Sequence, residues 1–311
     1  MSAARLYRIR LHLTAPLATP LTSGTLFGHL CWCRRELEGE KALVDWLRHQ
    51  EERPWLISDG FPADLLPRPL LRRDGSARLL ATEEADRAKK LARLPFLRME
   101  GFLKHRDSLS EATIAPYLAA APESAERPLL RHRMAHNSID RRRGTTPEEG
   151  GLFFVEEDWS FAVEARRDVY LKAAAEPGEI RLLFEHLGER GYGRDTTWGR
   201  GHFRVEGIEP LPALDAGRGS RRLSLSHGTL TANMEDVRYK LFTHFGKVGD
   251  VMAAGGARPW KKPILLARPG ATFRPRDEGP FGELLTGVHQ DRPEIRHDAR
   301  HLTLAFSEAE S

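Results

Sequence analysis

Residues 188–201 read GERGYGRDTTWGRG, a stretch that combines five glycines with three arginines and two aromatic residues. Glycine lets a backbone approach a ligand closely, arginine presents a planar fork to phosphate groups, and aromatic rings accept stacked bases. The combination predicts a loop that binds single-stranded nucleic acid, RNA rather than DNA. A flexible surface loop of the same composition is the alternative. The candidate RNA-binding residues here are Arg190, Gly191, Tyr192, Gly193, Arg194, Thr196, Thr197, Trp198, Gly199, Arg200 and Gly201.

The sequence on either side of this loop indicates its place in the fold. Before it, apolar residues recur with helical spacing over 180–187, and Gly188 stands where such a helix would end. After it, Phe203 and Val205 alternate with polar residues, as in a half-buried strand. The loop therefore joins a helix to a strand. A Rossmann loop joins a strand to a helix, and a P-loop ends in Gly-Lys-Ser/Thr, so both nucleotide-binding motifs are excluded.

Bulk composition sets broad limits on the protein class. The chain has 311 residues, long enough for two domains, and its 48 Lys and Arg against 44 Asp and Glu give a net charge of only +4. This charge permits a polyanionic partner without requiring one. No apolar run approaches the roughly 20 residues of a membrane span, and no secretory leader is evident, so we expect a cytoplasmic protein without a membrane partner. The two cysteines, Cys31 and Cys33, are expected to be packing residues.

The N-terminal segment predicts a strand, a loop and a helix. Residues 5–13 alternate apolar with polar side chains, and the outward set is basic. A loop rich in Thr, Pro and Ser follows, and then a helix that Thr22 or Ser23 would cap. Free amides at a helix N-terminus can hold a phosphate group. Thr22, Ser23 and Thr25 are therefore candidate RNA-binding residues, together with His29 in the first helical turns.

The remaining pattern predicts an α+β protein with two ferredoxin-like (RRM-like) domains. Strands are expected at 150–155, 159–165 and 202–208 and a helix at 179–187, which gives the order β-α-β-β-α-β. The first domain would span residues 1–210, with a long insertion and a β-hairpin thumb at about 51–148. After a linker at 211–221, residues 222–311 would form a degenerate second domain, with part of 234–250 helical and the segments around 264–273 forming a β-pair.

A second basic segment, RHRMAHNSIDRRRGTT at 131–146, contains five arginines and two histidines against one acid. A disordered basic arm or a solvated hairpin face would have such a composition. We favour an ordered hairpin whose tip contacts nucleic acid, with Met134 and Ile139 as apolar wedges between bases. Its candidate RNA-binding residues are Arg131, Arg133, His136, Asn137, Ile139, Arg141, Arg142 and Arg143.

A third segment, GKVGDVMAAGGARPWKK at 246–262, repeats the chemistry of the first loop more loosely. Four glycines precede Arg258, Trp260, Lys261 and Lys262, which are the candidate RNA-binding residues of this segment.

Catalytic signatures are weak. His29 lies beside the loop over 14–25, where a general base could act, but a packed helix histidine is the favoured interpretation. That loop contains no Asp or Glu, so a metal-dependent cleavage centred there is not expected. The histidine pairs at 132/136 and 297/301 lack a good third ligand. We therefore expect no catalytic residue, no metal and no cofactor.

Five segments, in this order, resemble the fourth Csm subunit of type III-A CRISPR effector complexes, a RAMP-superfamily family that caps the crRNA 5′ end. They are SGTLFGHL at 23–30, LPRPLL at 66–71, HNSIDRRRGTT at 136–146, GYGRDTTWGRGHF at 191–203 and KKPILLARPGATF at 261–273. The resemblance implies a non-catalytic subunit that holds the 5′ tag of the crRNA, with a thumb hairpin at 136–143 pressing into the guide–target duplex. It implies a large polymerase-like subunit and an adjacent backbone RAMP subunit as partners. In this role Tyr192 or Trp198 would stack a flipped base.

Three alternatives stay open at this point. The chain could be a metal-independent RAMP endoribonuclease that processes precursor crRNA with His29 as general base. Such enzymes carry their glycine loop near the C-terminus, whereas about a third of this chain follows it. The chain could also be the equivalent capping subunit of a type III-B or type I complex, or an interaction scaffold that does not bind RNA.

Overall fold

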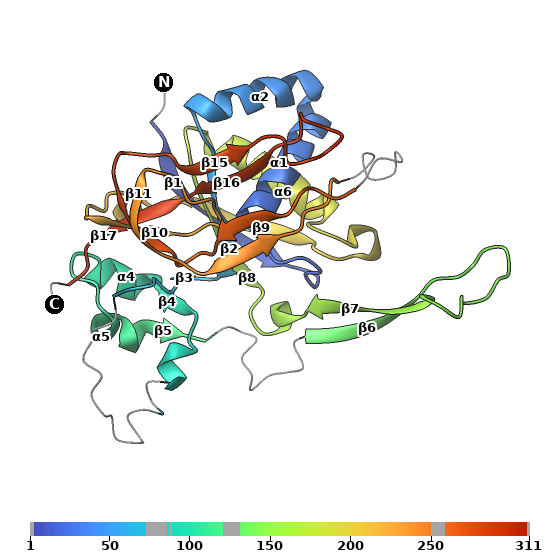
Figure 1. Cartoon of the computed structure of the whole chain (residues 1–311), viewed down its shortest axis with the longest axis horizontal. Coiled ribbons are helices and arrows are strands. Elements are labelled where there is room, and N and C mark those ends of the chain that lie inside the picture. Colours follow the sequence, from blue (N-terminus) through green and yellow to red (C-terminus); the bar gives the residue numbers. More distant parts are fainter. Residues whose placement is uncertain (1–2, 73–85, 87–88, 121–130, 250–258, 310–311) are drawn as a thin grey trace.

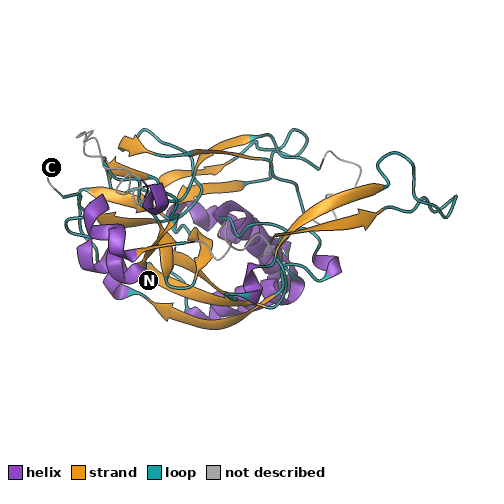
Figure 2. Cartoon of the chain, turned by 90° about the horizontal axis from the view of Figure 1, so that it is seen from below, coloured by secondary structure: helices purple, strands orange, loops and turns teal. Residues whose placement is uncertain are grey.

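The structure is a computed structural model, and it describes residues 3–72, 86, 89–120, 131–249 and 259–309. It is a mixed α/β fold built from antiparallel sheets, with a long β-hairpin that projects from the body of the molecule in both views (Figures 1 and 2). Within the described residues, no helix combines the length and the apolar character that crossing a bilayer would require.

The N-terminal half is organised around a four-stranded antiparallel sheet. Its strands are β1 (Arg5–Leu13), β2 (Leu56–Pro62), β8 (Arg166–Ala173) and β9 (Phe203–Pro210), in the order β2-β8-β1-β9. Helices α1 (Ser23–Glu38) and α6 (Pro177–Arg190) pack on one face of this sheet, and α2 (Glu40–Glu52) packs on α1 (Figure 1). Leu26 and Leu30 of α1 and Phe184 of α6 bury apolar surface against β1, and this burial is the main stabilising term of the layer.

The predicted order β-α-β-β-α-β is present in this sheet, but the prediction named the wrong second and third strands. The second strand is β2, within the segment predicted to be a long insertion, where Asp59, Gly60 and Pro62 obscure the strand pattern. The third strand is β8, whose Val169, Tyr170 and Leu171 are all buried. A strand covered on both faces shows a continuous apolar run, so a test for alternation does not detect it.

The two segments that were predicted to supply these strands lie outside the sheet. Residues 152–158 form β7 (Leu152–Asp158), which pairs only with β6 (Arg131–Asn137) among the described strands. Residues 159–165 contain a 3-10 turn, η3 (Ser160–Ala162), rather than a strand. The turn begins because the Asp158 carboxylate accepts a hydrogen bond from the Ser160 amide at 2.7 Å.

The outward face of β1 is less basic than its sequence indicates, because its arginines are paired. Arg10 donates two hydrogen bonds to the buried carboxylate of Asp168, at 2.8 and 2.9 Å, and a third to Asp64 at 2.7 Å. Arg8 is paired with Asp64 and Glu209. These carboxylates leave little unbalanced charge for an anionic ligand.

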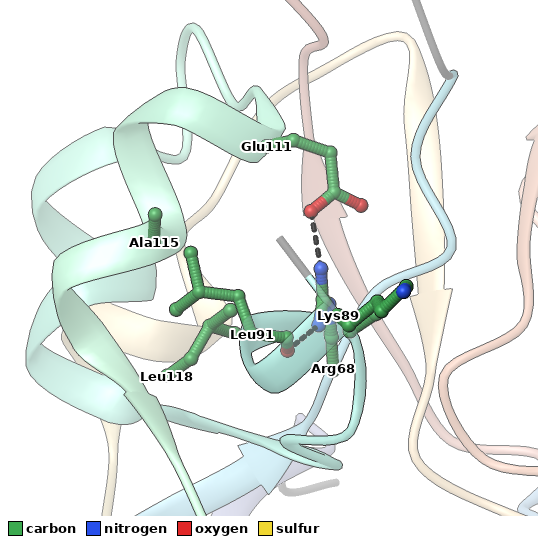
Figure 3. Close-up of a pocket in the computed structure, with 7 residues that line it drawn as sticks. Arg68, Lys89, Leu91, Glu111, Ala115 and Leu118 are labelled. Atoms are coloured by element: carbon green, nitrogen blue, oxygen red, sulfur yellow. Dashed lines mark hydrogen bonds and ion pairs between the residues drawn. The ribbon is translucent and has the colours of Figure 1, made fainter. Parts of the chain in front are cut away.

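The insertion after β2 is partly regular. Strands β3 (Leu65–Pro67), β4 (Phe96–Arg98) and β5 (Leu118–Ala119) form a small sheet beside α4 (Met99–His105), α5 (Glu111–Ile114) and the 3-10 helix η1 (Ala115–Tyr117). A hollow of about 450 Å³ lies between Leu91, Ala115 and Leu118 (Figure 3). Its one arginine, Arg68, is already bonded to Glu111 and to the Leu91 carbonyl. Lys89 also lines the hollow; its side chain is exposed, and its ammonium lies 3.7 Å from the Asp86 carboxylate.

Residues 211–309 begin with the short helix α7 (Pro212–Asp215) and continue as strands. β10 (Arg221–Ser224), β11 (Met234–Arg238), β14 (Thr272–Pro275) and β17 (Thr303–Phe306) form a sheet in the order β11-β14-β10-β17. β12 (Leu241–His244) pairs with β13 (Ile264–Ala267), and β15 (Phe281–Leu285) pairs with β16 (His297–His301).

Two predictions for this region are wrong. The segment 234–250 was expected to be partly helical, but its described residues hold β11 and β12, and the described part of 222–311 contains no helix. The segments around 264–273 were expected to pair with each other, but β13 and β14 belong to different sheets. The two halves of the chain share a core, since Leu6 and Phe61 pack in one cluster with Leu223 and Leu304.

Candidate nucleic-acid interface

The glycine-rich loop runs from the end of α6 to the start of β9, as predicted, and a 3-10 turn, η4 (Thr196–Trp198), interrupts it. Four of its glycines, at 191, 193, 199 and 201, have φ between 74 and 89°. At Gly193 a Cβ atom would also lie 2.6 Å from the Cβ of Thr19, so backbone and neighbour both require glycine there. The loop is thus a packed structure with a defined path.

Tyr192 holds this loop in place from inside the protein. Its side chain is fully buried, and its hydroxyl donates to the Pro20 carbonyl at 2.8 Å and accepts from the Thr22 amide at 3.1 Å. The expectation that Tyr192 stacks a base is therefore corrected, because the ring has no exposed face. The same contacts join the glycine-rich loop to the segment before α1.

His29 makes the second connection between the loop and α1. The Gly193 amide donates to its Nε2 atom at 3.0 Å, and its ring lies 4.9 Å from that of Tyr192. Burial, together with the nearby charge of Arg190, lowers the pKa of His29 to about 4. The imidazole is neutral at pH 7, and its Nε2 lone pair is occupied by the loop. His29 is placed to position the loop.

The N-terminus of α1 differs from the predicted phosphate site. Thr22 is the N-cap, as expected, but the Ser23 amide donates to the Asp59 carboxylate at 3.0 Å. Ser23 is buried, and the second oxygen of Asp59 bonds His227 Nδ1 at 2.6 Å. A carboxylate of the chain itself therefore occupies the position expected for a phosphate group. Thr22 and Thr25 remain partly exposed and bond each other at 2.9 Å.

The three arginines of the loop have different environments. Arg200 donates to the buried carboxylate of Glu157 at 2.7 Å, and Arg190 lies 2.9 Å from Glu36, so both already have a carboxylate partner. Arg194 is about half exposed; its guanidinium donates to the backbone carbonyls of Ala18 and Glu156 at 2.8 and 3.1 Å, and its Nε atom lies 3.7 Å from the Asp195 carboxylate. Arg194 is therefore the arginine of this loop that is best placed to meet a phosphate group.

The exposed residues of the loop are Arg194, Thr197, Trp198 and Gly199, and Thr196 is partly covered. The indole of Trp198 is more than half exposed. It lies against the imidazole of His136, with ring centroids 4.6 Å apart, and His136 in turn stacks on Phe153 at 5.4 Å. The glycine-rich loop and the hairpin are thus in direct contact.

The segment at 131–146 forms an ordered hairpin, which confirms its predicted structure. β6 and β7 pair along seven residues, and Arg131 lies at the start of this ladder. At the turn, Arg141, Arg142 and Arg143 are exposed together with Ile139. The Asn137 side chain accepts a hydrogen bond from Thr146 at 2.8 Å, which braces the turn.

One face of the hairpin carries apolar residues that are not among the predicted RNA-binding residues. Leu152 and Phe154 of β7 are exposed, and the guanidinium of Arg133 lies 4.6 Å from the Phe154 ring. The apolar run at 152–155 was evident in the sequence, but it was interpreted as a strand of the main sheet. An exposed apolar face next to a basic turn is what an arm that contacts bases and phosphates requires.

The third segment is only partly described, and Arg258 lies outside the described residues. Trp260 is exposed, and the Lys247 ammonium lies 4.2 Å from its ring. Lys261 donates to the Arg296 carbonyl at 3.2 Å, and burial lowers its pKa. Lys262 donates to the Gly287 carbonyl at 2.9 Å. Both lysines are therefore bonded to the protein backbone.

Across 3–72, 86, 89–120, 131–249 and 259–309, no group of three or more His, Cys, Asp or Glu side chains is arranged to hold a metal ion.

No protein-family model matches the sequence. No curated protein matches it either. Solved structures do match, over the whole chain. One is a chain of a Csm1–Csm4 cassette in complex with pppApApA, which aligns over 99% of this chain and 100% of its own length, with a TM-score of 0.60 and 16% identity. A chain of the cassette in complex with pppApA aligns over the same shares, with a TM-score of 0.58 and 17% identity.

A second kind of assembly gives the same result. A chain of the Csm3–Csm4 subcomplex in the type III-A CRISPR-Cas interference complex aligns over 97% of this chain and 99% of its own, with a TM-score of 0.54 and 13% identity. Csm4 is the component that the two assemblies share. The chain therefore shares its fold with the matching chains of these two assemblies.

Proposed function

We propose that the chain is a non-catalytic RNA-binding subunit of a type III-A CRISPR complex, which holds the 5′ tag of the crRNA and caps one end of the assembly. The observation that carries the proposal is the contact between Trp198 and His136, because it joins the glycine-rich loop and the basic hairpin into one surface. An exposed indole, a half-exposed Arg194 and the arginines of the hairpin turn supply a stacking ring and phosphate partners on that surface.

The tag would run from this surface along α1. Gly28 leaves the α1 backbone uncovered, since a Cβ atom there would have no neighbour within 4 Å. Thr25 is partly exposed one turn before it. The missing side chain at Gly28 lets a phosphodiester backbone approach the helix closely at this point. This path avoids the buried Ser23 and Tyr192.

A ferredoxin-like domain at 1–210 and a degenerate one at 222–311 are part of the same proposal. The four-stranded sheet of each half supports this division. In the assembly, the chain would contact the large polymerase-like subunit and the adjacent backbone subunit, because the matching chains come from Csm1–Csm4 and Csm3–Csm4 complexes.

The state of His29 supports a role without catalysis. A general base works best when its pKa is close to the working pH. A pKa of about 4 makes His29 a weak base, and the Gly193 amide occupies the atom that would accept the proton. Purified wild-type protein and His29→Ala should therefore leave precursor crRNA equally uncleaved, and cleavage that depends on His29 would establish the endoribonuclease instead.

The first experiment is to purify the tagged chain from cells that carry its CRISPR array and to sequence the RNA that co-purifies. The expected result is a set of crRNAs with one shared 5′ end. Heterogeneous RNA, or none, would overturn the proposal. The triple variant Arg141→Ala/Arg142→Ala/Arg143→Ala should retain less crRNA. If all three arginines contact phosphates, the slope of the logarithm of the binding constant against the logarithm of salt concentration should become shallower by about two units.

The matched control for that variant removes three exposed arginines from other parts of the surface, at Arg48, Arg218 and Arg276. Its retained RNA and salt slope should equal those of the wild type. Equal losses in the two triple variants would mean that only net charge matters and that the hairpin has no special role.

A further inference from the structure

The β-ribbon formed by β12, β13 and the strand-like residues that continue them has two different faces. On the inner face, Phe242 packs against His227 with ring centroids 4.6 Å apart, and Ile264 and Leu266 lie in a small core with Val288. His244 lies 4.8 Å from the buried His297. This face is covered by the rest of the protein.

The outer face of this ribbon is apolar and uncovered. Leu241, Phe245, Trp260 and Leu265 are 52 to 65% exposed. They belong to one face because Leu241 and Phe245 alternate with the inward Phe242 and His244, and Leu265 alternates with Ile264 and Leu266. Lys247 faces Trp260 on the same side, with its ammonium 4.2 Å from the ring. Such a stripe of large apolar side chains marks an interaction surface.

The charges of the same ribbon identify the kind of partner. Residues 239–249 and 259–268 contain five cations, Lys240, Lys247, Lys261, Lys262 and Arg268, and no Asp or Glu. Lys261, Lys262 and Arg268 bond backbone carbonyls, which leaves Lys247, exposed on the outer face, and Lys240, exposed next to the first residue of β12. An apolar centre with a basic rim is complementary to an apolar segment that is flanked by carboxylates.

We propose that the outer face of the β12–β13 ribbon, defined by Leu241, Phe245, Trp260 and Leu265, is a docking surface for a protein subunit that presents an apolar segment flanked by Asp or Glu. The occupant is a protein rather than RNA for two reasons. First, the Trp260 ring already lies 4.2 Å from the Lys247 ammonium, and Leu241 and Leu265 give bases no ring to stack on. Second, the outer face is opposite to the inner face, which packs on the body of the protein that carries α1, along which the RNA is proposed to run.

The proposed docking surface depends on the proposed function in one respect only, which is the choice of the type III-A complex as the assembly that contains the partner. The test is to co-express the full chain with the large and backbone subunits and the CRISPR array of its complex, and to compare wild type with Leu241→Glu/Leu265→Glu. The matched control is Leu182→Glu on α6, a leucine that is 51% exposed on another part of the surface. Three quantities are measured: the subunits that co-purify, the crRNA that the chain retains, and the midpoint of thermal unfolding.

The expected result is that the double variant loses one protein subunit, with at least a tenfold lower recovery, and keeps its crRNA and its unfolding midpoint. Lys240→Glu/Lys247→Glu should reduce recovery of the same subunit, because the rim would then repel the partner's carboxylates. Leu182→Glu should behave as wild type. If the double variant is too unstable to purify, Phe245→Glu replaces it, with the same three measurements and the same expected results.

Three results would overturn the proposal. Full recovery of every subunit with both ribbon variants would show that no subunit docks there. Loss of crRNA with all protein subunits retained would make the ribbon an RNA surface. Self-association of the isolated wild-type chain that the variant abolishes would mean that a second copy covers this face. Failure of the chain to retain crRNA at all, with the subunit loss as predicted, would reject the proposed function and leave the docking surface intact.

Discussion

The imidazole of His136, on the hairpin, lies against the indole of Trp198, in the glycine-rich loop, with ring centroids 4.6 Å apart. These residues are separated by more than sixty positions in the sequence, and each belongs to a segment with the composition of an RNA-binding element. Their contact fixes the direction of the projecting arm relative to the loop. The arm and the loop are therefore expected to respond together to substitutions at either residue.

Trp198→Ala should weaken crRNA binding by about 1–3 kcal/mol, roughly 5- to 150-fold, because it removes the stacking ring. It should also speed hydrogen exchange in β6, since the hairpin loses its contact with the loop. The control is Trp260→Ala, which removes an equally exposed indole, 54% in both cases, from the ribbon.

A double-mutant cycle of Trp198→Ala with His136→Ala should show a coupling energy of at least about 0.5 kcal/mol. If the effects of the two substitutions on the binding free energy are strictly additive, the two rings are not energetically coupled.

Tyr192→Phe should destabilise the protein by about 1–3 kcal/mol, because the Thr22 amide loses its hydrogen-bond partner in a covered environment. The measurement is the free energy of unfolding from urea denaturation. Tyr239→Phe is the control, since Tyr239 is exposed on the ribbon and its loss of a hydroxyl should change stability by less than about 0.5 kcal/mol. Equal effects of the two substitutions would show that the buried hydroxyl of Tyr192 has no structural role.

The sequence allows several of these features to be predicted, because they depend on local patterns. The charge run at 131–146 predicts the hairpin, and the glycines at 191–201 predict a loop between a helix and a strand. The first strand and the first helix follow from alternation and from helical spacing, which both reflect burial on a single face. Strand β8 was missed because both of its faces are covered.

The candidate site was less predictable, because the availability of a polar group depends on partners that are distant in sequence. Composition cannot show that Asp59, 36 residues away, occupies the amide of Ser23. It cannot show that Glu157 neutralises Arg200, or that the ring of Tyr192 faces inward. Residue type indicates which chemistry a segment could supply, and only the packing decides which side chains remain free to supply it.

Gly193→Ala should be more damaging than Gly199→Ala. The two residues have similar φ values, 83 and 76°, so alanine has the same backbone cost of roughly 1–2 kcal/mol at each. At Gly193 the new methyl group would also meet Thr19 at 2.6 Å, whereas at Gly199 nothing lies within 4 Å. Thermal unfolding and crRNA retention should therefore fall further for Gly193→Ala. Identical losses would indicate that the loop moves away from Thr19 at little cost.

His29 gives the protein a defined dependence of stability on pH. Burial lowers its pKa from 6.5 to about 4 in the folded state, while the unfolded chain should protonate near the ordinary value. Between these values the unfolded state binds more protons, so the free energy of unfolding should fall as the pH falls from 6.5 toward 4, by up to about 1.4 kcal/mol per pH unit for this one group. Above pH 6.5 the contribution is constant.

The variant that isolates this effect is His29→Gln, since the glutamine carbonyl can still accept a hydrogen bond from the Gly193 amide but does not titrate. Its free energy of unfolding should depend less steeply on pH over 4 to 6.5 than that of wild type, and the two slopes should coincide above pH 7. His49→Gln, at an exposed position on α2, serves as the control and should reproduce the wild-type slope. An unchanged slope in His29→Gln would show that His29 is protonated as readily in the folded protein as in the unfolded chain, and so that Gly193 does not hold it in the neutral form.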